Sequence, residues 1–140
     1  GVSNFTPAQT RALVAHLKAP LATLQPEFSP LHQDPITDGI LDLADELSAT
    51  VLAWSPLGGG RLFTESGPVQ DVINRIAKIK NLTPTQVALG FIQTVGAHVV
   101  PIVGTQTPAR IVEAAKAADL TLDGREFYDI VEAYRGEGMP

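Results

Sequence analysis

Four short polar or glycine-rich segments carry the residue types that could do chemistry, and each follows an apolar run. The segments are Ser3-Asn4, Gln25-Pro26-Glu27, Ser55 to Arg61 and Gly104-Thr105-Gln106. Their side chains are mostly neutral amides and hydroxyls, which suit the binding of a carboxamide or a phosphate and do not suit proton transfer at neutral pH. A helix-capping turn is the alternative interpretation of Ser3-Asn4. The Gln25 amide, at the end of an apolar strand, needs a buried hydrogen-bond partner.

The segment Trp54 to Leu62 combines an aromatic ring, three consecutive glycines and a cation. Glycines let backbone N–H groups approach a phosphate closely, and Arg61 adds positive charge. The face of the Trp54 ring suits stacking on a planar group, although a single Trp at a strand end is more often part of the core. The segment therefore predicts a phosphate-binding loop, with a flexible surface loop as the alternative.

A second candidate phosphate site begins where the apolar run Val99 to Val103 ends at Gly104. Thr107-Pro108 predicts a helix start there, with Arg110 in the first turn. Exposed N–H groups, the helix dipole and a guanidinium together favour a bound phosphate. Because the dipole disfavours a cation at this end of a helix, a binding role for Arg110 is favoured over a solvated surface position.

No set of residues suited to acid–base, nucleophilic or metal chemistry can be assembled. There is no Cys, and Glu27 has no second carboxylate or His at motif spacing. The spacing of the three histidines, His16, His32 and His98, fits no zinc motif. Tyr128 and Tyr134 belong to the last predicted helix, away from the strand ends. We therefore predict no catalytic residue and no metal site.

Helices and strands alternate along the chain. Capping residues followed by proline predict four helix starts, at Thr6-Pro7, Asp34-Pro35, Thr83-Pro84 and Thr107-Pro108. Two more helices are predicted over Val69 to Lys80 and about Arg125 to Tyr134. Continuous apolar runs predict strands, covered on both faces, at Leu21 to Leu24, Thr50 to Trp54 and Val99 to Val103. The first residues, Gly1-Val2-Ser3, are predicted to be the end of another strand.

Alternating βα units predict a parallel sheet with right-handed crossovers. Eight such units close a barrel of about 250 residues, whereas four leave two open sheet edges. The unpaired N–H and C=O groups of an open edge can pair with another chain. We therefore expect a second half, a dimer partner or a rearranged edge to complete the sheet. The segment Gly1 to Phe5 holds only the end of a strand before a helix begins, and it suggests a piece of a larger βα protein.

The composition limits the class of protein. The 140 residues are 44% hydrophobic with mean hydropathy +0.12, the net charge is −5 and the pI is about 5.0. An acidic chain without a basic cluster argues against nucleic acid and anionic membrane as partners. No apolar run approaches the roughly 20 residues of a membrane span. These features predict a cytoplasmic globular chain of one domain.

Four stretches, in this order, give the chain a family resemblance. They are GVSNF at 1–5, QPEFSPLHQ at 25–33, AWSPLGGGRL at 53–62 and PIVGTQTPARIVEAA at 101–115. Over essentially all of its length, residues 1–140, the chain resembles the C-terminal, cofactor-binding half of an aldo-keto reductase of the bacterial oxidoreductase branch. The resemblance implies an α/β fold, the last four βα units of a (β/α)8 TIM barrel, that binds NADPH and reduces carbonyl compounds to alcohols.

The resemblance also implies a role for each site residue. By motif position, the nicotinamide carboxamide would be held by Ser3, Asn4 and Gln25, and the nicotinamide ring would stack on Trp54 in place of the more usual Tyr. The pyrophosphate would be lined by Ser55, Leu57, Gly59 and Arg61. The adenosine ribose and its 2′-phosphate would meet Gly104, Thr105, Gln106 and Arg110, with Glu113 near adenine. Gln106 and Ala114 depart from the Lys and Asn of many members, whereas Arg110 still favours NADPH over NADH.

In this family the catalytic Tyr, Lys, Asp and His precede the segment that opens this chain, so the resemblance implies a truncated reductase without turnover of its own. Its partner would be the missing N-terminal half-barrel, and a small carbonyl compound would be the substrate of the complete enzyme. The alternative is a stand-alone half-barrel, a nucleotide-binding or assembly module that covers its open edges by self-association. An ion-channel auxiliary subunit is a third possibility that the bacterial motifs disfavour.

Overall fold

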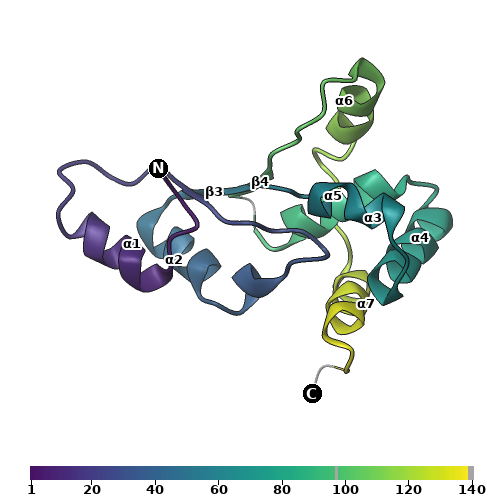
Figure 1. Ribbon diagram of the computed structural model, residues 1–140, viewed down its shortest axis with the longest axis horizontal. Coiled ribbons are helices and arrows are strands. Elements are labelled where there is room, and N and C mark those ends of the chain that lie inside the picture. The colour runs from purple at the N-terminus through teal and green to yellow at the C-terminus, as the bar shows by residue number, and fades with distance from the viewer. Residues whose placement is uncertain (97, 139–140) are drawn as a thin grey trace.

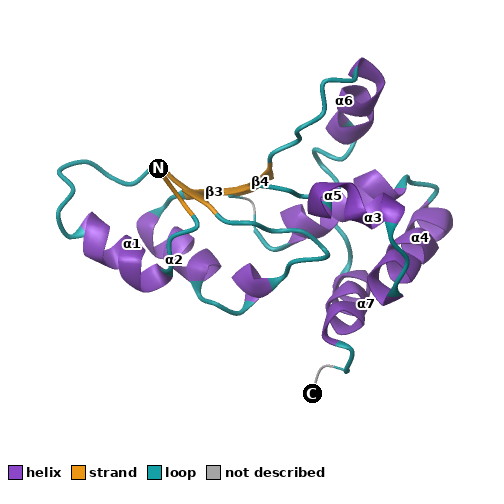
Figure 2. Ribbon diagram, viewed as in Figure 1, coloured by secondary structure: helices purple, strands orange, loops and turns teal. Residues whose placement is uncertain are grey.

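The computed structural model describes residues 1–96 and 98–138, and its centre is a four-stranded parallel sheet. The strands lie in chain order, as β1 (Val2–Ser3), β2 (Thr23–Gln25), β3 (Thr50–Ala53) and β4 (Val99–Pro101). Parallel neighbours joined by helical crossovers are what the βα rhythm predicts (Figures 1 and 2). The strands are shorter than the apolar runs, and β2 begins two residues later than predicted.

Helices follow each strand (Figure 1). The α-helices are α1 (Pro7–Val14), α2 (Ile40–Leu47), α3 (Arg61–Thr64), α4 (Pro68–Lys80), α5 (Pro84–Thr94), α6 (Pro108–Ala115) and α7 (Gly124–Arg135), and two 3₁₀ turns are η1 (Asp34–Ile36) and η2 (Gly58–Gly60). Thr6, Thr83 and Asp123 each close a capping box, with a Gln or Glu side chain three residues later bonding back.

One predicted helix start differs from the structure, and another lacks its predicted cap. Asp34-Pro35 begins only the turn η1, and α2 starts at Ile40, where the Asp38 carboxylate accepts a hydrogen bond from the Ile40 N–H at 2.8 Å. Gly39, with φ at +83°, separates the two. At Thr107 the helix start is correct, but the Thr107 side chain makes no capping hydrogen bond.

The two faces of the sheet differ in exposure. Leu24, Val51 and Val99 are neighbours in register and are all buried in the main core against the helices, α2 among them. On the opposite face, Leu52 is half-buried and its neighbour Val100 is 46% exposed. The prediction of strands covered on both faces is therefore wrong for this chain, because one face of the half-barrel lies open.

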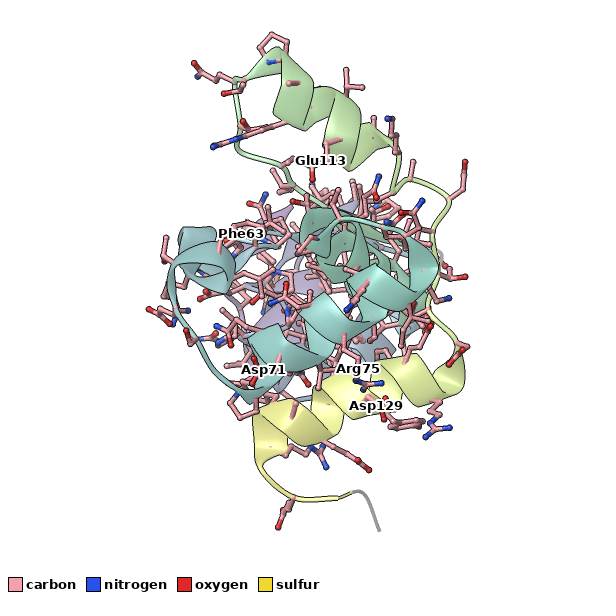
Figure 3. All side chains as sticks on the ribbon, turned by 90° about the vertical axis from the view of Figure 1, so that its right-hand side faces the viewer. Phe63, Asp71, Arg75, Glu113 and Asp129 are labelled. Carbon is pink, nitrogen blue, oxygen red and sulfur yellow. The ribbon has the colours of Figure 1, made fainter. Side chains whose placement is uncertain are left out.

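Helices α4, α5 and α7 form a packed block beside the sheet. Phe91 of α5 is fully buried, and it contacts Phe28 at a ring-centroid distance of 5.9 Å and Phe127 of α7 at 5.0 Å. Arg75 of α4 and Asp129 of α7 form an ion pair at 2.6 Å on the surface of this block (Figure 3).

Helix α6 stands apart from that block (Figures 1 and 3). It packs through a small separate cluster in which Ala114 and Ala117 meet Leu89 of α5. Its other apolar side chains, Ile111 and Val112, are 49% and 57% exposed. In the described part of the chain, no helix is both long and apolar enough to cross a membrane.

Candidate cofactor-binding site

The C-terminal ends of β3 and β4 open into a groove of about 1070 Å³. One wall comes from Trp54, the glycine turn η2 and α3, the floor from the start of α5 and the residues after β4, and the other wall from α6. The lining residues are Trp54, Ser55, Pro56, Leu57, Gly59, Gly60, Phe63, Thr64, Thr83, Pro84, Thr85, Ile102, Val103, Gly104, Thr105, Arg110, Glu113 and Ala114. A groove of this size is ample for a small organic ligand or cofactor.

A polar cluster joins the ends of β1, β2 and β3. The Trp54 indole N–H donates to Asn4 Oδ1 at 2.9 Å. The backbone carbonyl of Gln25 accepts from the Asn4 N–H at 3.1 Å and from the Ser3 hydroxyl at 2.9 Å. The structure thus brings together the four predicted residues Ser3, Asn4, Gln25 and Trp54. The predicted partner of the Gln25 amide is absent from the described residues: the side chain is half-buried and makes no hydrogen bond there, and it is the backbone carbonyl that accepts from Asn4 and Ser3.

Backbone strain marks both turns of this cluster. Asn4 and Ser55 directly follow β1 and Trp54, and they have φ values of +57° and +49°. Left-handed backbone costs a non-glycine residue roughly 1–2 kcal/mol, less for Asn, and it persists where the surroundings hold it. Both turns are held by hydrogen bonds, from Asn4 N–H to Gln25 and from Gly58 N–H to Ser55 at 2.8 Å.

The glycine turn has one packed and two open positions. All three residues of η2 have positive φ. A Cβ on Gly58 would lie 2.9 Å from Leu31 Cδ1, whereas one on Gly59 or Gly60 would meet no atom within 4 Å. Gly59 and Gly60 therefore present bare backbone to the groove, as a phosphate-binding loop requires.

The second predicted phosphate segment supplies the facing wall. Gly104, Thr105, Arg110 and Glu113 all line the groove, and a Cβ at Gly104 would again meet nothing within 4 Å. The Thr105 hydroxyl accepts from the Thr107 N–H at 3.2 Å and shapes the turn into α6. Arg110 and Glu113 lie one helical turn apart, with Glu113 on the side of α6 that faces the rest of the chain (Figure 3).

Five predicted site residues are not part of the groove lining. Ser3, Asn4 and Gln25 belong to the polar cluster beside Trp54, and the other two are Arg61 and Gln106. The Arg61 side chain is exposed and turns back, with its Nε–H donating to the Gly58 carbonyl at 3.1 Å. Gln106 is also exposed and is not part of the lining. The segments that hold Arg61 and Gln106 line the groove, but these two side chains are not part of its lining.

Two parts of the lining were not predicted from the sequence. The first is α3, whose Phe63 is 51% exposed and lines the groove; it follows the glycines in a segment that reads as loop. The second is the start of α5, where Thr83, Pro84 and Thr85 line the floor. The cap-proline signal located this helix start, but no local pattern shows that it lies beside β4.

Metal ligands do not gather in the part of the chain that the structure describes. No group of three or more His, Asp or Glu side chains there could hold an ion. His98 instead pairs with Asp45 at 3.2 Å, outside the groove.

A comparison with protein-family models matches residues 1–135 to the aldo/keto reductase family. The chain belongs to this family. Among curated relatives, this aldo/keto reductase chain is 41% identical to a 6-dehydroglucose reductase of Novosphingobium aromaticivorans and 36% identical to the oxidoreductase YdhF of Escherichia coli. Both alignments cover 100% of the chain but only 47% and 48% of the relatives. The chain thus spans about half the length of the relatives it matches.

Solved structures of the family share its fold. The thermostable aldo-keto reductase Tm1743, crystallised with epalrestat, aligns with a TM-score of 0.83 and 25% identity over 93% of this chain and 46% of its own. An aldo/keto reductase of Klebsiella pneumoniae, crystallised with NADP and acetate, aligns with a TM-score of 0.82 and 26% identity over 96% and 47%. The predicted family and the predicted partial (β/α)8 barrel are confirmed.

Proposed function

We propose that this chain is the C-terminal, cofactor-binding half of an NADPH-dependent aldo-keto reductase that acts on aldehydes or ketones. The observation that carries the proposal is the groove, which has the Trp54 ring, bonded to the adjacent Asn4 amide, at one end and bare glycine backbone with Arg110 farther along. That order of groups suits a nicotinamide, then phosphates, then a ribose 2′-phosphate. Membership of the family supports the reductase class.

The residues present fit such a cofactor. Ser3, Asn4 and Gln25 would hold the carboxamide, the Trp54 face would support the ring, and Ser55, Leu57 and Gly59 would line the pyrophosphate. Gly104, Thr105 and Arg110 would hold the ribose and 2′-phosphate, with Glu113 near adenine. Gln106 and Arg61, which lie beside the groove, would reach a ligand only by changing rotamer.

When bound, nicotinamide supplies the hydride that reduces a carbonyl carbon. The residues of this chain would bind and orient the ring, and Trp54 and Phe63 would present apolar surface beside it. Protonation of the alkoxide oxygen requires an acid close by. Tyr128 and Tyr134 belong to α7 and do not line the groove. We therefore propose that the acid comes from outside this chain, from the other half of the barrel.

Calorimetric titration of the folded chain tests this proposal. NADPH should bind saturably and more tightly than NADH, and Arg110→Ala should weaken NADPH about tenfold with little effect on NADH, because only NADPH carries the 2′-phosphate. Arg125→Ala, at an exposed position in α7, is the matched control. With an aldehyde present, the chain alone should not oxidise NADPH. Absence of saturable NADPH binding by chain that is folded by circular dichroism would contradict the proposal.

A non-catalytic assembly module is the second candidate, and the open sheet face favours it. Val100 is 46% exposed there, and among the strands that the structure describes β1 pairs with β2 alone and β4 with β3 alone. A half-barrel partner, either different or a second copy, would cover both edges. Sedimentation equilibrium distinguishes these cases. A concentration-dependent dimer that Val100→Lys abolishes supports self-association, and a monomer at all concentrations excludes it.

A further inference from the structure

Trp54 and Asn4 are 50 residues apart in the chain, and the hydrogen bond between them fixes which way the Asn4 amide points. The indole Nε1 lies 2.9 Å from Asn4 Oδ1. An indole N–H is only a donor, so the amide atom that faces it has to be the oxygen. The Asn4 Nδ2 group, with its two N–H donors, therefore faces away from Trp54. In the described part of the chain no other group accepts from it.

The backbone of Asn4 is held as firmly as its side chain. Its φ of +57° places it in the left-handed region, which Asn tolerates better than most residues. Its N–H donates to the Gln25 carbonyl at 3.1 Å. With the backbone N–H and Oδ1 both engaged, the polar group that the Asn4 side chain still offers to a ligand is a donor.

Ser3 presents the opposite polarity. Its hydroxyl hydrogen is donated to the same Gln25 carbonyl, at 2.9 Å, so its oxygen offers lone pairs to any further partner. Two adjacent exposed residues thus show a ligand one donor and one acceptor. A primary carboxamide carries the complementary pair, because its carbonyl oxygen accepts and its NH₂ group donates.

We propose that Trp54 is a positioning residue: its indole N–H holds the Asn4 amide in the orientation that presents Nδ2 to the carbonyl oxygen of the ligand's carboxamide. This edge-on role is separate from any stacking by the face of the ring. The inference rests on the proposed function, because it takes the ligand to be a nicotinamide dinucleotide.

One test needs no ligand. The chain contains a single Trp, so the indole N–H gives one cross-peak in a ¹⁵N–¹H correlation spectrum. Asn4→Gly, which suits the positive φ, should shift this peak and speed its exchange with solvent. Asn81→Gly is the matched control, because Asn81 also has a positive φ, of +54°, and is exposed. An indole signal that Asn4→Gly leaves unchanged would overturn the inference whatever the ligand.

A second test separates the N–H from the ring. Trp54→Phe keeps an aromatic face and removes the donor. It should weaken NADP⁺ binding about five- to tenfold, the net value of one hydrogen bond, and leave binding of 2′-phospho-ADP-ribose, which has no nicotinamide, unchanged. In an Asn4→Gly background most of the loss for NADP⁺ should vanish, because the residue through which Trp54 acts has gone.

The outcomes are distinguishable. If Trp54→Phe costs the same with and without Asn4, Trp54 acts through its ring alone and the inference fails while the proposed function stands. If Trp54→Phe weakens 2′-phospho-ADP-ribose equally, its role is general structure and the inference again fails. If neither ligand binds to the unsubstituted chain, the proposed function is wrong, and so is the assumption that the ligand is a nicotinamide dinucleotide.

Discussion

The rings of Phe91 and Phe127 stack with their centroids 5.0 Å apart and their planes 17° from parallel, and this contact joins α5 to α7. Phe91 also touches Phe28, which follows β2, so one buried side chain connects the sheet side of the core to the last helix. The groove depends on this arrangement, because α5 provides its floor.

Phe91→Ala should therefore destabilise the chain strongly, by about 3–5 kcal/mol, through lost burial and the cavity that remains. Urea unfolding followed by circular dichroism measures the change. Phe63→Ala makes the same chemical change at a 51% exposed position and should cost less than about 1 kcal/mol. If the two variants lost similar amounts of unfolding free energy, Phe91 would not be a central residue of the core.

Thr83→Ala should cost about 1 kcal/mol, because the Thr83 hydroxyl accepts from the Gln86 N–H at the start of α5. Thr107→Ala, at a helix start where the side chain makes no capping bond, should change the unfolding free energy by only a few tenths. Thermal or urea unfolding of the pair checks the difference, and equal costs would mean that the capping box contributes nothing.

Gly58→Ala should be more destabilising than Gly59→Ala. Both residues have positive φ, so each substitution carries the roughly 1–2 kcal/mol cost of left-handed backbone. Only the new Cβ at 58 also meets Leu31, at 2.9 Å. The difference in unfolding free energy isolates that contact. Gly59→Ala should in addition weaken ligand binding, because its Cβ enters the groove, and unimpaired binding would place the ligand elsewhere.

Arg75→Met should cost at most about 1 kcal/mol despite the 2.6 Å ion pair with Asp129, because the Arg75 side chain is half exposed. The cost should shrink further in high salt, which screens exposed pairs. Urea unfolding at low and high salt measures it. A loss of several kcal/mol that salt does not alter would show that the pair is effectively buried.

The predictable parts of the fold are those with local causes. Thr6-Pro7 and Thr83-Pro84 begin helices because the cap and the fixed φ of proline act within a few residues. Asp34-Pro35 carries the same signal yet forms only a 3₁₀ turn. Gly39 follows this turn in a left-handed conformation, and the Asp38 side chain caps the helix α2, which begins at Ile40. One local signal was thus overridden by another a few residues on.

The site was predictable as a set of segments and not as a set of contacts. The glycine turn and the β4–α6 segment, both predicted to bind phosphate, line the same groove. The direction of Arg61 depends on a carbonyl three residues earlier, and the contribution of α5 depends on packing beside β4. The bond from Trp54 to Asn4 spans 50 residues, so no pattern along the chain contains it.

Because α6 packs on its own small cluster, it should move more readily than the other elements that line the groove. Its buried contacts belong to the small cluster of Leu89, Ala114 and Ala117 and not to the main core. Segments with few buried apolar contacts open at low free energy while the rest of a domain stays folded. We therefore expect the backbone amides of α6 to exchange with deuterium sooner than those of α5. A ligand that binds in the groove then has to order α6, and this lowers its net affinity. Hydrogen exchange of the α6 amides should be the first to slow when such a ligand binds.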